Sequence, residues 1–249
     1  MPAPMLTAAA LFAVAVLYSA VGHAGASGYL AVLALAGLAP EAMKPTALVL
    51  NLVVATVGTI QFARAGHFAW RTFWPFALGS IPAAYVGGMI RLPVTSYRAV
   101  VGAVLLLSAV RLLWTARGGA DERAARADAG APPLWGALPV GVGLGFLSGL
   151  TGVGGGIFLS PVLLLLGWAG AKRTAAVSVA FILVNSAAGL LGHLASVQRV
   201  PAEVALWAPI VLVGGFIGSS LGSRVLPGLA IRRLLAVVLV LAGLKLLGA

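Results

Sequence analysis

The sequence has no cysteine and very little charge. Only 8% of its 249 residues are charged, with 16 Lys plus Arg and 5 Asp plus Glu. The absence of cysteine excludes disulfides, thiolate metal ligands and a cysteine nucleophile. A soluble domain has about 25% charged residues, because its whole surface faces water. So few charges beside 61% hydrophobic residues indicate a surface that faces lipid.

The net charge of +11 does not indicate nucleic-acid binding. No basic cluster exceeds two adjacent residues, and the basic residues lie between apolar runs, where they face water and anionic head groups. We therefore expect the lipid bilayer as a partner and no nucleic acid. No G-x-x-x-x-G-K-[ST] motif occurs, so we expect neither ATP hydrolysis nor a cofactor. Met1-Pro-Ala-Pro-Met5 contains no basic residue, which predicts a retained first span rather than a cleaved signal peptide.

The apolar residues form ten runs, none of which alternates with polar residues as a barrel strand does. The runs cover residues 5–21, 28–38, 46–63, 72–90, 99–116, 134–151, 157–170, 174–198, 204–223 and 234–249. Most are long enough for a helix that crosses the hydrocarbon, which needs about 17–25 residues. The runs 28–38 and 157–170 are short, and each follows a glycine-rich break, Gly22-His-Ala-Gly-Ala-Ser-Gly28 or Gly152-Val-Gly-Gly-Gly156.

The two halves of the chain repeat each other. Gly22-x-x-Gly25 aligns with Gly152-x-x-Gly155 at a shift of 130, and the shift reaches 135 further along. The later pairs are Lys44-Pro-Thr-Ala47 with Lys172-Arg-Thr-Ala175, Gly79 with Gly214, Gly87 with Gly222, Leu92-Pro93 with Leu226-Pro227, and Arg98 with Arg233. We predict an all-α polytopic membrane protein with two inverted-topology repeats of about five segments each, at residues 1–117 and 134–249. A polar linker at 118–133 joins them.

The basic residues favour the inverted arrangement. Five segments per half is an odd number, so the second half begins on the opposite face of the membrane. This arrangement places eleven basic residues on the cytoplasmic side and five outside, whereas single crossings by 5–38 and 134–170 place eight on each side. Because cytoplasmic loops are enriched in Lys and Arg, we expect both termini outside. A re-entrant hairpin has the same parity as two short crossings, so both remain open.

The glycine-rich breaks are the candidate binding site. A helix that begins after such a break has backbone N–H groups without internal partners, at the positive end of its dipole. These donors suit an anion, and glycine lets an oxyanion approach the backbone. In the inverted model both helix N-termini point at one site near the midplane. The alternative is that the glycines only allow close helix packing, as we expect for Gly141, Gly143, Gly145 and Gly149.

Polar side chains on the following spans complete this candidate site. The predicted substrate-binding residues are Gly25, Ala26, Ser27, Gly28, Asn51, Gly154, Gly155, Gly156, Ser178 and Asn185, with Thr56, Thr59 and Ser186 as further polar neighbours. The alternative for the side chains is hydrogen bonding between helices. No carboxylate lies in mid-membrane, so proton coupling would need His23, His193 or a substrate that carries its own proton. Both histidines can also be structural.

An enzyme is the competing prediction. Gly25-Ala-Ser27-Gly28 has the G-x-S-G pattern of rhomboid intramembrane proteases, with His193 as a candidate base. The pattern is short in a chain with 33 glycines, and the second break has no matching serine.

At the breaks the chain resembles the sulfite exporter TauE/SafE family of membrane transporters. The resemblance rests on Gly152-Val-Gly-Gly-Gly156, Pro161 and Ala175-Ala-Val-Ser178, with support from Asn51, Phe62-Ala-Arg-Ala-Gly66 and Gly79-Ser-Ile-Pro-Ala-Ala-Tyr-Val-Gly87. It covers nearly the whole chain. It implies a transporter of sulfite, organosulfonates or other small organic acids. Gly25-Ala-Ser-Gly28 replaces a full glycine triplet and Val177-Ser178 replaces Thr-Ser, which leaves the substrate open. We expect a secondary transporter of the inner membrane that works by alternating access.

Overall fold

The computed structural model describes residues 4–38, 40–90, 132–197 and 200–227, with residues 106 and 110 and separate positions between 229 and 244. These residues form helices and no strand. The helices are α1 (Pro4–Ala20), α2 (Ala26–Leu35), α3 (Pro40–Arg64), α4 (Trp70–Met89), α7 (Leu134–Thr151), α8 (Gly156–Leu165), α9 (Ala171–Val197) and α10 (Val204–Ser220), followed by a π-helical turn, η1 (Leu221–Val225). The all-α prediction is confirmed for these residues. Most of the runs 99–116 and 234–249, and most of the linker 118–133, lie outside them.

Helix length separates spans from short segments. Four helical stretches are long and apolar enough to cross a membrane: Ala42–Arg64, Leu134–Thr151, Ala171–Ser196 and Val204–Val225. By contrast α2 and α8 have 10 residues each, or about 15 Å of helix against a hydrocarbon layer of about 30 Å. Neither can cross alone, so the prediction of a short second segment after each glycine-rich break is confirmed.

The surface of these helices suits lipid. Leu206 and Phe216 on α10 are 70% and 58% exposed, and Trp135 at the start of α7 is 83% exposed. Conversely, Asn51, Ser178 and other polar side chains are fully buried. This distribution, with large apolar groups outside and polar groups inside, is the one that a hydrocarbon solvent favours.

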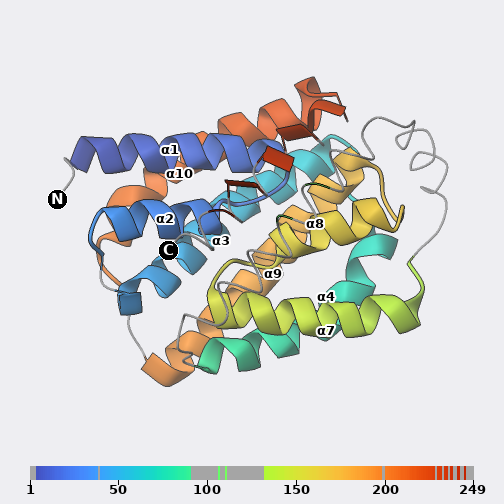
Figure 1. The fold of residues 1–249 in the computed structure, drawn as a ribbon, viewed down its shortest axis with the longest axis horizontal. Helices are drawn as coiled ribbons and strands as arrows, with labels where there is room; N and C mark the ends of the chain where they lie inside the picture. Colours follow the sequence, from blue (N-terminus) through green and yellow to red (C-terminus); the bar gives the residue numbers. More distant parts are fainter. Residues whose placement is uncertain are drawn as a thin grey trace.

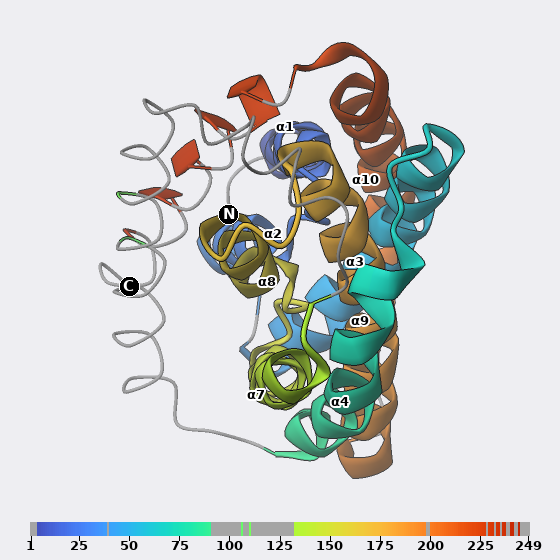
Figure 2. The same cartoon turned by 90° about the vertical axis from the view of Figure 1, so that its right-hand side faces the viewer.

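The helices pack in pairs that combine the first and second halves of the chain. Figure 1 shows α1 along α10 at one edge and α7 along α4 at the opposite edge. The long α3 and α9 contact each other, and each also contacts an edge pair, α3 through α10 and α9 through α4. The short α2 and α8 lie between the two edge pairs, as the turned view shows (Figure 2). The N-terminal ends of both short helices, at Ala26 and Gly156, are buried.

Glycine brings the edge helices into backbone contact. On α7, every fourth residue faces α4, where an added Cβ would overlap a backbone carbonyl. The residues in contact are Gly141 with Phe76, Gly145 with Ser80 and Gly149 with Ala84. The packing prediction is confirmed for these three and wrong for Gly143, which has no neighbour within 4 Å because it lies on the opposite face of α7. Gly214 and Gly218 of α10 and Gly222 of η1 contact Phe12, Val16 and Ala20 of α1 in the same way.

Candidate functional site

The two breaks are tight turns that need glycine. Gly22 and Gly25 have φ of +77° and +108°, and Gly152, Gly154 and Gly155 have φ of +76°, +82° and +79°. An L-residue with a side chain is strained in this left-handed region. The sequence of each break therefore ends one helix, reverses the chain and begins the next helix within a few residues.

The second turn leaves backbone N–H groups without a backbone acceptor at the start of α8. The N-cap of α8 is Gly155, and no side chain caps this end. Phe158 and Leu159 donate to the carbonyl of Gly155, both at 3.1 Å, whereas the N–H groups of Gly154 to Ile157 have no backbone acceptor among the described residues. At α2, Tyr29 donates to the carbonyl of Gly25 at 2.9 Å. Unpaired donors at a helix N-terminus favour negative charge.

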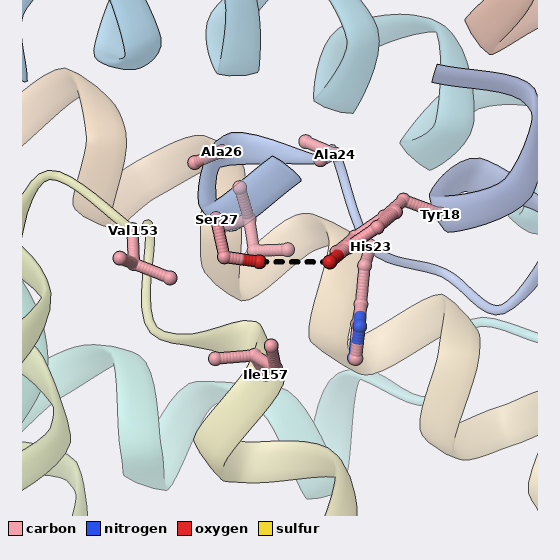
Figure 3. A pocket seen from close by; sticks show the side chains of 9 residues that line it. Tyr18, His23, Ala24, Ala26, Ser27, Val153 and Ile157 are labelled. Atoms are coloured by element: carbon pink, nitrogen blue, oxygen red, sulfur yellow. Dashed lines mark hydrogen bonds between the residues drawn. The ribbon is translucent and has the colours of Figure 1, made fainter. Parts of the chain in front are cut away.

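Both breaks line one cavity (Figure 3). Its walls are Tyr18, His23, Ala24, Gly25, Ala26 and Ser27 from the first break and the end of α1, Val153 and Ile157 from the second break, and Ile182 from α9. Ser27 Oγ donates a hydrogen bond of 3.1 Å to the hydroxyl of Tyr18 across it. The cavity has room for on the order of one water molecule, so the two breaks lie close together around it. No wall residue is an acid, a lysine or an arginine.

A chain of buried polar groups joins the first break to the second half. His23 Nε2 lies 2.8 Å from Ser160 Oγ on α8, and Ser160 Oγ donates to Ser178 Oγ on α9 at 2.8 Å. His23 is 2% exposed and the two serines are fully buried. His23 Nδ1 is buried with no partner in the described part of the chain.

A second polar pair lies against the second break. Asn51 Nδ2 donates to Ser186 Oγ at 3.3 Å. A Cβ added at Gly154 would lie 2.8 Å from Asn51 Nδ2 and 3.0 Å from Ser186 Oγ. The side chains of α3 and α9 therefore meet at the glycine turn, where only a residue without a side chain fits.

A comparison with known families agrees with these features. The family model for the sulfite exporter TauE/SafE matches residues 6–246. The chain belongs to the sulfite exporter TauE/SafE family. A "Probable membrane transporter protein y4hK" of Sinorhizobium fredii is 44% identical to this TauE/SafE chain over 241 residues, which are 96% of each protein. No solved structure matches the chain.

As a TauE/SafE family member, the chain is a multi-pass membrane transporter and not an enzyme. This finding removes the protease prediction. The structure gives a physical reason as well, because the residue of α9 that lines the cavity with Ser27 is Ile182. His193 lies eleven residues further along α9, about 16 Å at 1.5 Å per residue.

The cavity of this TauE/SafE protein collects part of the predicted site. Gly25, Ala26 and Ser27 line it, and Gly154, Gly155 and Gly156 form the turn beside it. Gly28 faces α1, since its added Cβ would lie 2.5 Å from Val14 Cγ1. Asn185 Nδ2 donates to the carbonyl of Phe181 one turn earlier, at 2.8 Å, and its buried Oδ1 has no partner in the described residues.

Three polar residues of the site carry no obvious signal in the sequence. Ser160 is a single serine inside an apolar run, and Tyr18 and Tyr29 lie among apolar residues in the sequence. The glycine breaks were the signal that located the region. Ser160 lies one helical turn after Gly156, so a search for polar residues within a turn of each break would have found it.

Proposed function

We propose that the protein moves a small anion, namely sulfite, an organosulfonate or a related small organic acid, across the inner membrane by alternating access. The observation that supports this most is the shared cavity, because glycine-rich breaks from both halves of the chain line it. The N–H groups of both breaks belong to helix N-termini inside a membrane protein, and those of Gly154 to Ile157 have no backbone acceptor among the described residues. Buried donors without acceptors are costly in hydrocarbon, and a bound oxyanion satisfies them.

The proposed binding residues are donors without charge. The backbone of Gly25 to Ser27 and of Gly154 to Gly156 supplies N–H groups, and Asn51, Ser178 and Asn185 supply side-chain donors from α3 and α9. Amides and hydroxyls bind an oxyanion without the strong attraction of a lysine or arginine. Such a site releases its substrate readily, which a transporter requires. Gly28 takes no direct part, because it packs on α1.

The glycine geometry supports an inverted repeat. Three pairs of glycines with positive φ lie 130 residues apart: Gly22 with Gly152, Gly25 with Gly155, and Gly37 with Gly167. Helices α2 and α8 have equal lengths and begin 130 residues apart, at Ala26 and Gly156. The contacts also match, since α1 packs on α10 as α7 packs on α4. In such a repeat the halves exchange conformations, so that the site opens to one face and then to the other.

The conformation described here fits the middle of that cycle. The cavity has room for on the order of one water molecule. The Ser27–Tyr18 hydrogen bond and the His23–Ser160 contact close it on the sides of α1 and α8. In this proposal the cavity widens when the breaks separate and admit the anion.

Counterflow in proteoliposomes tests the proposal. Vesicles loaded with unlabelled sulfite, isethionate, sulfate or lactate are given labelled substrate outside, with a neutral sugar as the negative control. We expect exchange of at least one small sulfur oxyanion and none of the sugar. Exchange of neutral solutes alone, or of nothing, would refute anion transport.

A pair of glycine variants locates the site. Gly155→Val and Gly167→Val both place a side chain at a positive φ, of +79° and +67°, so the two share the same backbone strain. At Gly155 the new Cβ lies 2.9 Å from Phe181 Cε1 beside the break, whereas Gly167 has no neighbour within 4 Å. We expect exchange to fall at least about tenfold more in Gly155→Val than in Gly167→Val, a difference of about 1.4 kcal/mol. Equal exchange by the two inserted variants would show that the break does not bind substrate.

A further inference from the structure

The cavity contains one side chain that can carry a full positive charge, His23. It belongs to the first break, is 2% exposed and lines the cavity together with residues of the second break. The remaining wall is apolar except for Tyr18 and Ser27. A histidine that is fully inside a membrane protein needs a partner or a function, because burial of an ionisable group is otherwise unfavourable.

The hydrogen bonds of His23 fix its tautomer. Ser160 Oγ has one hydrogen, and it donates that hydrogen to Ser178 Oγ. Ser160 therefore accepts from His23, whose Nε2 carries the hydrogen in their contact of 2.8 Å. The other ring nitrogen, Nδ1, is then an unprotonated base, and it is buried without a partner among the described residues. A buried base without a donor can accept one proton when a bound anion balances the charge.

The other groups near His23 do not neutralise a charge on it. The ring of Tyr18 lies with its centroid 6.5 Å from that of His23, and Tyr29, on α2, has a buried hydroxyl beside Gly25. Ser160 on α8 and Ser178 on α9 are uncharged. The basic side chain at the second break, Lys44, packs on Gly152 and donates to the carbonyl of Gly88 at 3.2 Å. No acid lines the cavity, so an imidazolium there would have to be balanced by a bound anion.

We propose that His23 couples the anion to a proton. Nδ1 takes one proton from water on the side to which the site is open, and the imidazolium then pairs with the anion held by the two helix N-termini. When the site opens to the other side, the anion leaves and Nδ1 returns the proton to water. No other bond is made or broken. This inference rests on the proposed anion transport and names its coupling ion.

Coupling changes the charge that crosses the membrane. The helix dipoles bind an anion but add no net charge to what moves, so uncoupled transport of a monovalent anion follows the membrane potential. A potential of 100 mV then biases its distribution about 50-fold. With one proton per anion the movement is electroneutral, and the potential has no effect on the distribution.

The experiment measures exchange, proton movement and potential dependence on the full-length protein in proteoliposomes. The probes are isethionate, a sulfonate that stays ionised at all pH values used, and sulfite. Counterflow comes first, because exchange needs no net charge or proton movement and so tests the anion transport itself. Net uptake of the probe that exchanges is then followed with a pH dye inside the vesicles, with and without a 100 mV potassium diffusion potential.

The matched variants are His23→Gln and His67→Gln. His67 lies in the α3–α4 connection, where its Nε2 contacts the carbonyl of Ser223 at 3.0 Å, and it is outside the cavity. We expect the wild type and His67→Gln to acidify the vesicle lumen during uptake and to accumulate isethionate independently of the potential. We expect His23→Gln to exchange the probe more weakly, because it loses the imidazolium that pairs with the anion, and to move it without acidification. Its accumulation should follow the potential up to about 50-fold.

Four results would overturn the inference. Absence of exchange with both probes would refute the proposed function, and this inference with it. A wild type that exchanges the probe but moves no protons during net uptake would refute the coupling alone. Acidification that persists during net uptake by His23→Gln would do the same. If His23→Gln does not exchange the probe, Ser160→Ala tests the role of His23 instead. This variant keeps the imidazole but removes the hydrogen-bond acceptor of Nε2. We expect its pH profile of exchange to shift relative to the wild type, and an unchanged profile would contradict a role for His23.

Discussion

A negative charge at Asn51 tests the proposed anion site most directly. Asn51 is fully buried, and its amide lies 2.8 Å from where a Cβ at Gly154 would be. Asn51→Asp keeps the shape of the side chain, and Ser186 can donate its hydroxyl hydrogen to the new carboxylate. An anion on the N–H groups of the turn would lie on the order of 5 Å from that carboxylate. At an effective dielectric constant of about 20 the repulsion is about 3 kcal/mol, or about a 200-fold loss of affinity.

Gln61→Glu is the matched control, since it also adds a buried acid to α3. Gln61 is 6% exposed and bonded to Ser220 and Phe216. It lies ten residues beyond Asn51, about 15 Å along the helix, where the repulsion falls to about 1 kcal/mol.

The assay is counterflow of labelled sulfite or isethionate, with the half-saturating concentration measured at several pH values. At high pH, Asn51→Asp should bind the labelled anion about 30-fold more weakly than Gln61→Glu does. This factor corresponds to the difference of about 2 kcal/mol between the two repulsion energies. The affinity of Asn51→Asp should recover as the pH falls, because protonation removes the charge. Equal affinities of the two folded variants, or a loss in Asn51→Asp that does not depend on pH, would refute anion binding at this turn.

Two further predictions concern packing and topology. Gly145→Ala should lower the free energy of unfolding of the detergent-solubilised protein by about 1–3 kcal/mol, because the new Cβ overlaps the carbonyl of Ser80. Gly143→Ala, on the open face of α7, should not lower it. Equal melting temperatures of the two variants would contradict the backbone contact. The natural absence of cysteine allows Gly37→Cys and Gly167→Cys to be labelled without a background. In an inverted repeat a membrane-impermeant thiol reagent added to intact cells should label Cys at position 37 and not at 167, and labelling of both from one side would refute the inversion.

The sequence was sufficient to place the helices and the breaks but not the contacts between them. Apolar runs and glycine clusters are local signals, so α7 was predicted with the bounds that the structure has, and α2 and α8 were predicted to be short. Which residues share the cavity depends on how distant helices pack. His23 and Ser160 are 137 residues apart, and no periodicity relates them. Gly28 follows Ser27 directly in the sequence, but it lies on the face of α2 that packs against Val14 of α1.

The glycine contacts of α4 and α10 determine which parts of the molecule can move as units. Since α7 touches α4 backbone to backbone, and α10 touches α1 in the same way, each edge pair is a stiff body in which one helix comes from each half of the chain. Any rocking that opens the cavity must therefore take place between these mixed pairs. The proposed repeats and these mixed pairs are therefore different divisions of the protein.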